Sequence, residues 1–364
     1  MKISYIANVR LPTEKAHGVQ IMKMCEAFAD LGHEVELVVP RRINNLKDNP
    51  FEYYGAKNNF KIVKLACLDT VQFGFFGFLI EWLSFAEFVF WHFLFRKKDI
   101  YFGRDYIALL YLSFLGRKTV WEAHTGEWNI LIWFFSKFGK KIVAISNGLK
   151  DFYVSKGVLP QKIIVAHDGV DFEQFDIYIN KEKVKEDLGI KSDLPVVLYI
   201  GALGLWKGVE TLLEASAFIF GKAQVVIIGG EEKQIILLCK KYPGVLFLGP
   251  RPYRELPINQ KIADILVIPN TAKDKISTSY TSPLKMFAHM ASGVPIVVSD
   301  LPSIREVLNE DNSYFAEPDS PKSFADVIKK VLSDPARAQK SANALDDARM
   351  HTWSMRASSI INSI

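Results

Sequence analysis

Cysteine is scarce in this sequence of 364 residues. The three cysteines, Cys25, Cys67 and Cys239, lie far apart and in apolar contexts. An odd number of widely spaced cysteines provides neither a disulfide framework nor the ligand spacing of a zinc site. The scarcity of cysteine therefore favours a reducing, cytoplasmic location.

Several other signals are missing. The first residues, MKISYIANVR, run directly into a strand pattern without a long apolar region, so we expect no secretory signal. Ala7-Asn8-Val9 follows that strand, where a dinucleotide-binding enzyme would carry G-x-G-x-x-G, and this disfavours hydride transfer. No clear carboxylate and histidine set for sugar-nucleotide epimerisation is evident. No lysine and arginine stripe is interleaved with aromatic residues, so no nucleic-acid partner is expected.

What is present is the composition of an ordinary soluble protein. Hydrophobic residues make up 49% of the chain and charged residues 23%, which argues against disorder. The length exceeds that of a typical single core, so two domains are expected. The net charge of +5 is compatible with anionic ligands or with a membrane surface.

Short β-rich runs alternate with helical runs along the chain. This alternation is typical of mostly parallel sheets that helices cover on both faces. The first series of expected strands comprises Lys2–Ala7, His33–Val39, Ile62–Leu65, Ile100–Phe102, Thr119–Glu122, Lys141–Ile145 and Lys162–Val165. The second series comprises Pro195–Ile200, Gln224–Gly229, Val245–Gly249, Ile265–Ile268 and Ile296–Val298.

We therefore predict an α/β fold of two doubly wound halves. A charged linker of low structure is expected near residues 176–193, so that the first domain covers residues 1–176 and the second covers 194–342. The tail, residues 343–364, has a helical pattern. Ligands of such sheets bind at the carboxyl ends of the strands, and two facing domains form a natural cleft.

The aromatic segment Phe73–Lys98 is nearly long enough to span a bilayer. Glu81, Glu87 and His92 interrupt it, and a carboxylate at mid-membrane costs about 2.5–3.5 kcal/mol on insertion scales. We expect two short helices, partly packed on the core and partly exposed. Three interpretations of this segment remain: packing inside the protein, contact with a membrane surface, and a true membrane span. The basic run Arg96–Lys98 beside aromatic residues suits the surface of a membrane.

The stretch Ser279–Ile304 predicts a polar loop, a short amphipathic helix, a Gly-Val-Pro turn and a buried strand. A loop of small residues that opens a helix can direct backbone N–H groups and the positive helix end at an anion. Lys285 in the first turn adds a charge suited to a phosphate. The alternative is an ordinary loop, helix and strand of an α/β domain with a surface lysine.

The carboxyl-terminal half carries, in order, YIGALGLWKGVETLLEA, VVIIGG, LGPRPYREL, ADILVIPN and SPLKMFAHMASGVPIVVSDLPSIREVL. The amino-terminal half carries HGVQ, GHEVELVVP, WEAH, VAISNGLKD and HDGVDFEQF. With these segments in this order, the chain resembles the family 4 glycosyltransferases over essentially its whole length. Each piece alone is a weak signal, and together they are highly specific.

The resemblance implies two facing Rossmann-like domains, the GT-B fold, with a nucleotide-sugar donor in the cleft between them. It also implies sugar transfer with retention of anomeric configuration, without a cofactor or a required metal. The final helix would return to the amino-terminal domain, and Trp353 and Arg356 lie where that helix usually begins.

In the carboxyl-terminal half, the resemblance implies a donor site. Lys207 matches the lysine that contacts the donor phosphates, where it would stabilise the charge of the leaving diphosphate. Ser282 and the backbone amides of Leu284 and Lys285 match the cap of the distal phosphate. Arg251 lies in the loop that holds the base and is a candidate phosphate or base contact. A solvated loop lysine is the alternative for Lys207.

In the amino-terminal half, two residues match the family's site. Gly18 matches a glycine-rich loop, where the missing side chain permits close approach of a ligand. His124 matches a histidine near the transferred sugar. A simple turn glycine and a buried structural histidine are the alternatives.

Some positions depart from the family's pattern. Tyr280 and Ala288 stand where the family usually has paired glutamates, the second of which binds the ribose hydroxyls. Ala202 stands where the family has a phosphate-binding arginine, so that Lys207 and Lys285 would supply the positive charge.

The resulting prediction is a retaining, hexosyl-type glycosyltransferase with a nucleotide-diphosphate sugar as donor and a glycan or lipid-linked acceptor. We expect it in the cytoplasm at the inner face of the cell membrane, with Phe73–Lys98 in peripheral contact. The alternative, motivated by the missing glutamates, is a catalytically silent binding or scaffold subunit of the same fold.

Overall fold

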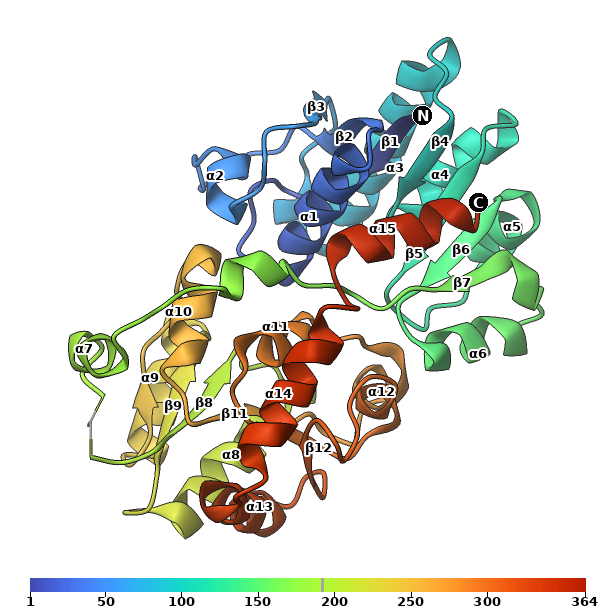
Figure 1. Ribbon diagram of the computed structural model, residues 1–364. Coiled ribbons are helices and arrows are strands. Elements are labelled where there is room, and N and C mark those ends of the chain that lie inside the picture. The colour runs from blue at the N-terminus through green and yellow to red at the C-terminus, as the bar shows by residue number, and fades with distance from the viewer. Residues whose placement is uncertain (191–192) are drawn as a thin grey trace. The chain divides into compact units, whose positions relative to one another are not determined.

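The computed structural model describes residues 1–190 and 193–364 and divides into two compact units (Figure 1). The first unit comprises Met1–His167 together with Trp353–Ile364, and the second comprises Asp168–Thr352. The sequence placed these boundaries at residues 176 and 343. The first boundary lies earlier because the short turn Phe172–Phe175 packs on a helix of the second unit.

The first unit is a parallel sheet with strand order β3-β2-β1-β4-β5-β6-β7. Its strands are β1 (Lys2–Ile6), β2 (Glu34–Pro40), β3 (Lys61–Leu65), β4 (Ile100–Gly103), β5 (Thr119–Ala123), β6 (Lys141–Ala144) and β7 (Ile163–Val165). Its helices are α1 (Ala16–Asp30), α2 (Pro50–Tyr54), α3 (Gly74–Leu94), α4 (Tyr106–Phe114), α5 (Ile130–Phe138), α6 (Asn147–Ser155) and α15 (Trp353–Asn362). Helix α15 belongs to this unit and packs on α1, and it begins at Trp353, later than the expected start of the tail at residue 343.

The second unit repeats the plan with strand order β10-β9-β8-β11-β12-β13, again parallel. Its strands are β8 (Val196–Ile200), β9 (Gln224–Ile228), β10 (Leu246–Phe247), β11 (Ile265–Ile268), β12 (Ile296–Ser299) and β13 (Tyr314–Ala316). Its helices are α7 (Lys181–Asp187), α8 (Val209–Ala215), α9 (Glu232–Lys241), α10 (Leu256–Lys261), α11 (Leu284–Ser292), α12 (Pro302–Arg305), α13 (Pro321–Ser333) and α14 (Arg337–Ala348).

Both sheets confirm the predicted fold class of two Rossmann-like α/β halves. The central strands are mostly apolar and almost entirely buried, as expected for a sheet covered on both faces. In each sheet the strand order reverses between two neighbours, β1 and β4 in the first unit and β8 and β11 in the second. Ligands of doubly wound folds bind at the carboxyl ends of the strands at such a point.

Two local predictions were wrong, and one strand was missed. The segment after Phe73 forms one continuous helix, α3, instead of two, because it contains no proline and its interrupting carboxylate, Glu81, is buried and accepts a hydrogen bond from Asn8 Nδ2 at 3.1 Å. The predicted linker contains α7, in which buried Lys185 lies 4.0 Å from Asp264. Residues 191 and 192 of that linker lie outside the described residues. Strand β13 was not predicted.

Candidate functional site

Lys207 lies at the switch point of the second sheet, in the loop that follows β8. It ends the 3₁₀ turn Leu205–Lys207, and Gly208 follows in the left-handed conformation with φ 62°. A Cβ at Gly208 would lie 1.9 Å from the carbonyl oxygen of Pro269, so the close approach of the two loops requires glycine. The Lys207 Nζ lies 3.4 Å from the centroid of the Trp206 ring. Burial lowers the pKa of Lys207 to about 8.

Lys285, in the first turn of α11, lies close enough to Lys207 for the two charges to interact. Its Nζ is buried and has no hydrogen-bond partner in the described part of the chain. That Nζ lies 4.0 Å from the centroid of the buried Tyr199 ring. A Cβ at Gly201 would lie 3.0 Å from it, so the glycine leaves open space beside the ammonium group. Burial, and then Lys207, hold the pKa of Lys285 well below its usual range.

The start of α11 also has backbone N–H groups that could bind an anion. Pro283 is the N-cap residue and provides no side-chain capping bond to the first amides of the helix, which begins at Leu284. The buried Ser282 hydroxyl has a structural contact, because it accepts a hydrogen bond from the Asp168 backbone N at 3.1 Å. The predicted residues Lys207, Ser282, Leu284 and Lys285 thus lie in one unit, the first on the loop after β8 and the others at the start of α11. The two segments approach each other where the turn Leu205–Lys207 contacts Ile276–Tyr280.

The positions of the missing glutamates hold no carboxylate. Tyr280 ends a π-helical turn, Ile276–Tyr280, and Ala288 is buried on α11. His289 beside it is fully buried, and neither ring nitrogen has a hydrogen-bond partner among the described residues. Burial, and then the charge of Lys285, lower the pKa of His289 to about 3, so this ring is neutral.

The Arg251 guanidinium forms an ion pair with a neighbouring carboxylate. Its Nη2 lies 2.7 Å from Glu255 Oε2, four residues along the chain. Both side chains are about 30% exposed, at 31% and 29%. The guanidinium is therefore partly neutralised where the sequence suggested a phosphate or base contact.

In the first unit, the buried carboxylate of Glu122 organises a polar network at the end of β5. Its Oε1 lies 2.6 Å from Arg356 Nη2 of α15. Gln20 Nε2 donates to both carboxylate oxygens at 2.8 Å, and the Tyr5 hydroxyl donates to Oε2 at 2.8 Å. Burial acts to raise the pKa of Glu122, but Arg356 and His124 outweigh it and hold that pKa well below its usual range.

His124 lies at the edge of this network. Its Nε2 is 3.4 Å from Glu122 Oε2. Burial, and then the nearby Arg104, lower the pKa of His124 to about 4, so the ring is neutral at physiological pH. The same two causes lower the pKa of His17 to about 4. Arg104, two neutral imidazoles and a buried carboxylate thus gather at the carboxyl ends of β4 and β5, near the switch point of this sheet.

Gly18 lies inside the first turns of α1 and is not a turn glycine. A Cβ there would lie 2.1 Å from the Tyr54 hydroxyl. That hydroxyl is fixed because it accepts from the Thr13 backbone N at 2.6 Å and donates to the Thr13 carbonyl oxygen at 2.7 Å. The missing side chain therefore accommodates Tyr54, so packing alone requires a glycine at this position.

Substituting Gly18 by alanine should therefore destabilise the first unit by about 1–3 kcal/mol, since the anchored Tyr54 ring cannot move aside. Chemical denaturation of the variant measures this loss. The double variant Gly18→Ala/Tyr54→Leu removes the obstructing hydroxyl and should recover part of the stability. An unchanged midpoint for Gly18→Ala would contradict this packing role.

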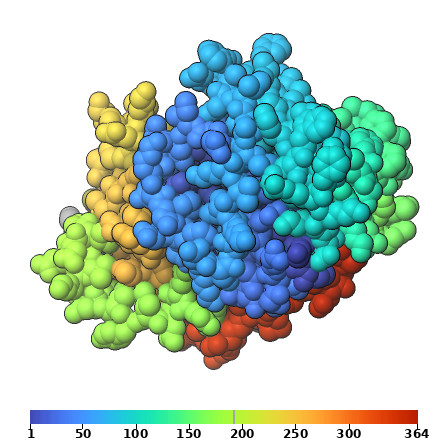
Figure 2. All heavy atoms as spheres, turned by 90° about the horizontal axis from the view of Figure 1, so that it is seen from above, coloured from blue at the N-terminus to red at the C-terminus, as the bar shows by residue number. Residues whose placement is uncertain are grey.

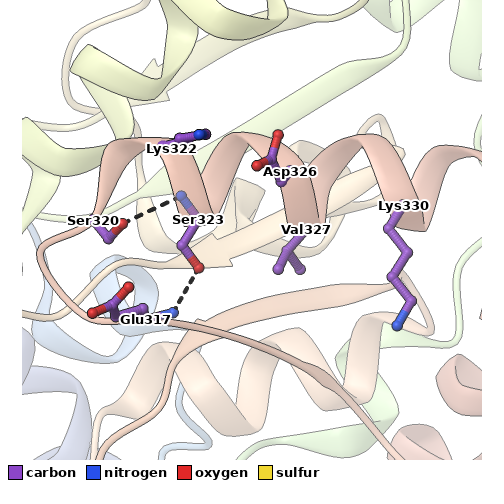
Figure 3. A pocket seen from close by; sticks show the side chains of 7 residues that line it. All are labelled: Glu317, Ser320, Lys322, Ser323, Asp326, Val327 and Lys330. Carbon is purple, nitrogen blue, oxygen red and sulfur yellow. Dashed lines mark hydrogen bonds between the residues drawn. The ribbon is translucent and has the colours of Figure 1, made fainter.

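Two shallow hollows lie away from the predicted residues. One, of about 310 Å³, is lined by Trp128, Asn129, Ile130 and Trp133 at the start of α5. The other, of about 450 Å³, lies along α13 (Figure 3). There Ser323 N donates to Ser320 Oγ and Ser323 Oγ accepts from Glu317 N, bonds that cap the helix. No group of three or more His, Cys, Asp or Glu side chains suited to a metal ion is present among the described residues.

Sequence reasoning missed several residues of these two sites. Glu122 carried a signal, because a carboxylate inside the buried run TVWEA has to be paired. Arg104 and His17 carried none, since only the strand order brings them near His124. Tyr199 and Trp206 belonged to the recognised motif, but only the structure shows their rings against the two lysines.

Two family models match almost the whole chain. Residues 17–174 match "Glycosyltransferase Family 4" and residues 180–348 match "Glycosyl transferases group 1". An uncharacterized glycosyltransferase of Methanocaldococcus jannaschii is 30% identical over 208 residues, which are 53% of this chain and 51% of that protein. A D-inositol 3-phosphate glycosyltransferase of Corynebacterium aurimucosum is 25% identical over 241 residues, 61% of this chain and 55% of that protein. The matches thus span about half the length of these curated relatives.

A solved structure extends the similarity of fold to the full length. The chain superimposes on Anabaena HepE, crystallised with UDP-glucose, with a TM-score of 0.78 and 16% identity, covering 100% of both chains. The sheet orders, the returning helix and the two consecutive family matches agree with one another. The chain therefore belongs to the family 4 glycosyltransferases and has their GT-B fold of two Rossmann-like domains.

Proposed function

We propose that this protein transfers a sugar, of hexosyl type, from a nucleotide-diphosphate sugar to a glycan or lipid-linked acceptor, with retention of anomeric configuration. The observation that carries the proposal is the pair of lysines in the second unit, Lys207 and Lys285. Neither lysine has an ion pair with a carboxylate in the described part of the chain, and the Lys285 Nζ is buried. Two neighbouring buried ammonium groups are costly unless an anion joins them.

A diphosphate is an anion of suitable charge for this pair. As the sugar–phosphate bond breaks, negative charge grows on the leaving diphosphate, and two fixed cations stabilise that change without reorganisation. The amides of Leu284 and Lys285 at the start of α11 add donors for the distal phosphate. We assign Lys207 and Lys285 as the principal donor-phosphate residues, with Ser282 beside them. No metal or cofactor has a step in this scheme.

His124 is proposed to contact the transferred sugar as a neutral ring. If Nε2–H faces the Glu122 carboxylate, 3.4 Å away, Nδ1 remains as an acceptor for a sugar hydroxyl. Glu122 then acts as a positioning residue, because Arg356, Gln20 and Tyr5 hold its carboxylate in place. Gly18 and Arg251 are assigned no ligand contact, since Tyr54 and Glu255 account for them.

The absence of a carboxylate at Tyr280 and Ala288 has a consequence for donor recognition. Nothing at these positions can accept the paired hydrogen bonds of a ribose, which contribute about 1–3 kcal/mol when made to a charged group. We therefore propose that donor affinity rests mainly on the diphosphate. The reaction is proposed to take place in the cytoplasm at the inner face of the membrane.

The activity is tested by incubating the protein with UDP-, GDP- and ADP-sugars and a lipid extract as the acceptor source. The expected result is release of one nucleoside diphosphate together with a glycosylated product in which NMR finds the anomeric configuration of the donor. HepE of Anabaena was crystallised with UDP-glucose, so UDP-sugars are tested first. Product with inverted configuration would contradict retention, and no release from any donor would favour a silent subunit.

Binding of a diphosphate should be linked to proton uptake. The pKa of Lys207 is lowered to about 8 in the free protein, and a bound anion favours the charged form and raises it. Uptake is therefore expected above about pH 8, where Lys207 is partly neutral, and Lys285, whose pKa is also lowered, adds to it. Calorimetric titrations of UDP at about pH 8.5 in buffers of different ionisation enthalpy measure this uptake. Absence of uptake at that pH would contradict the assignment.

A further inference from the structure

Helix α3 exposes an unusual amount of apolar side chain. On the helix and at its ends, Phe75 and Phe76 are each 75% exposed, Trp91 is 60% exposed and Phe95 is 89% exposed. Together with Val71–Phe73 it is long and apolar enough, by length and composition, to cross a membrane, yet only 28% of its apolar window is buried. A helix in the core of a soluble domain would bury most of these side chains.

The exposed surface continues over two neighbouring helices. Helix α3 packs on α4, and α4 packs on α5. Aromatic pairs join the three, because the Phe90 and Tyr111 rings lie 6.3 Å apart and the Phe114 and Phe138 rings lie 5.2 Å apart. We call this surface the aromatic face and define it by its exposed residues, Phe73, Phe75, Phe76, Ile80, Leu83, Phe88, Trp91, Phe95, Phe114, Ile130, Trp133 and Phe138. In Figure 2 this part of the chain, from light blue to green, lies on the outside of the first unit.

Basic residues gather at one edge of the aromatic face. The helices follow parallel strands, so their carboxyl ends all lie at the amino-terminal edge of the sheet. That edge carries the exposed side chains of Arg96, Lys97, Lys118, Lys137 and Lys140. The exposed acidic residues between residues 73 and 140 are Glu87, Asp99 and Glu127, and Glu127 precedes α5 at the other edge of the sheet. Glu87 accepts a hydrogen bond from Trp91 Nε1 at 2.7 Å, and Asp99 accepts one from the Lys2 backbone N at 2.6 Å.

The other side of α3 shows that the helix lies on its own domain. Gly77, Phe85, Val89 and Phe93 are buried on that side, and Glu81 accepts the hydrogen bond from Asn8. A helix with one side packed on a folded domain and an aromatic, basic-edged opposite side is typical of proteins that lie in the membrane interface. Tryptophan and basic residues favour the headgroup region of a bilayer.

We propose that the aromatic face binds the surface of an anionic phospholipid bilayer. The aromatic side chains enter the boundary between headgroups and acyl chains, and the basic edge contacts the negative headgroups. Charge complementarity favours an anionic bilayer, because this region carries five exposed cations and only three exposed carboxylates. Two of these carboxylates accept hydrogen bonds from the protein itself. The hollow lined by Trp128, Ile130 and Trp133 lies at the same surface, as an apolar recess for an acyl chain.

Flotation of the full chain with lipid vesicles tests the proposal. Vesicles of phosphatidylcholine alone are compared with vesicles of equal parts phosphatidylcholine and phosphatidylglycerol. We expect strong binding to the anionic vesicles, weakened by salt, and little binding to the neutral ones. Phe76→Ser/Trp91→Ser should lower the partition coefficient by about tenfold or more. Lys97→Glu/Lys137→Glu should lower the partition coefficient on anionic vesicles by about tenfold. On neutral vesicles this substitution should leave the partition coefficient unchanged.

Matched controls lie on the second unit. The control variants are Phe220→Ser, at a side chain that is 78% exposed, and Lys233→Glu/Lys240→Glu, at two exposed lysines. Both are expected to bind vesicles as the unaltered protein does. Circular dichroism checks that each variant is folded. Lys207→Met should also bind vesicles normally, so failure of the donor site and failure of this proposal are distinguishable. Equal binding to both vesicle types, no binding to either, or self-association through the aromatic face in its place would overturn the proposal.

Discussion

Lys285→Met and Lys207→Met are each expected to lower the affinity for a nucleoside diphosphate by about ten- to hundredfold, and the double variant should abolish measurable binding. In the proposed complex each ammonium group donates charge-assisted hydrogen bonds to the diphosphate, away from bulk water, and about 1.4 kcal/mol corresponds to each tenfold loss of affinity. Methionine keeps most of the unbranched apolar chain and removes the ammonium group with its charge and its donors. Isothermal titration with UDP, GDP and ADP measures the effect.

Without ligand, the Lys285→Met substitution should not lower the stability of the fold. Removing an unpaired buried ammonium group relieves its desolvation, so Lys285→Met should be as stable as the unaltered protein, or more stable, without ligand. Lys233→Met, on the exposed α9, is the matched control for affinity and should change nothing. If Lys285→Met unfolds at lower denaturant and binds UDP normally, the lysine has a structural role and the assigned site is wrong.

Arg356→Ala is expected to destabilise the first unit by about 3–5 kcal/mol. The guanidinium is the charge partner of the fully buried Glu122, and it also donates to the backbone carbonyl of His167 at 2.7 Å. Its removal leaves the buried carboxylate without its ion-pair partner. It also removes the hydrogen bonds from α15 to the carbonyl oxygens of Ala166 and His167. Denaturant unfolding, followed by tryptophan fluorescence, measures the loss.

Two further variants separate the charge effect from general damage to the helix. Arg349→Ala removes an arginine whose side chain is 60% exposed and pairs with Asp346 at 3.7 Å, so a loss of about 0.5 kcal/mol or less is expected. Glu122→Gln/Arg356→Met removes both buried charges and should recover part of the stability lost in Arg356→Ala. An effect of Arg356→Ala no larger than that of Arg349→Ala would show that the pair is not needed.

The same pair implies a pH dependence. Because the pKa of Glu122 in the folded protein is well below its usual range, the pair stabilises the fold above the pKa of an unfolded glutamate. This contribution is lost as the pH falls through the folded pKa, and it should therefore persist into the acid range. In Glu122→Gln the corresponding acid-dependent loss should be absent.

The sequence predicts the strands of both sheets well because their signals are local. Continuous apolar runs such as Ile265–Ile268 and Ile296–Ser299 are typical of strands buried on both faces, and each boundary follows from the polar residues beside it. Strand β13 is only three residues long and has no comparable run. Helix α7 consists mostly of charged residues, and its position depends on the burial of Lys185, which no local pattern indicates.

The two candidate sites show the same difference between local and long-range signals. Lys285 was predicted from the loop and helix start beside it in sequence, and Lys207 was predicted from the family motif that surrounds it. The contacts that account for Gly18 and His124 come from Tyr54, Glu122 and Arg104, which the fold brings in from other strands and loops. Long-range packing of this kind leaves no signal in a single sequence, so local reasoning identified candidate residues better than their surroundings.

The central claim is that Lys207 and Lys285 form a diphosphate site, and one titration tests it most directly. The unaltered protein is titrated with UDP, UMP and uridine, and then with GDP and ADP. The account predicts micromolar binding of one nucleoside diphosphate, much weaker binding of its monophosphate and no measurable binding of its nucleoside, since Tyr280 and Ala288 offer the ribose no carboxylate. Absence of diphosphate binding at millimolar concentration, or equal binding of uridine and UDP, would contradict it.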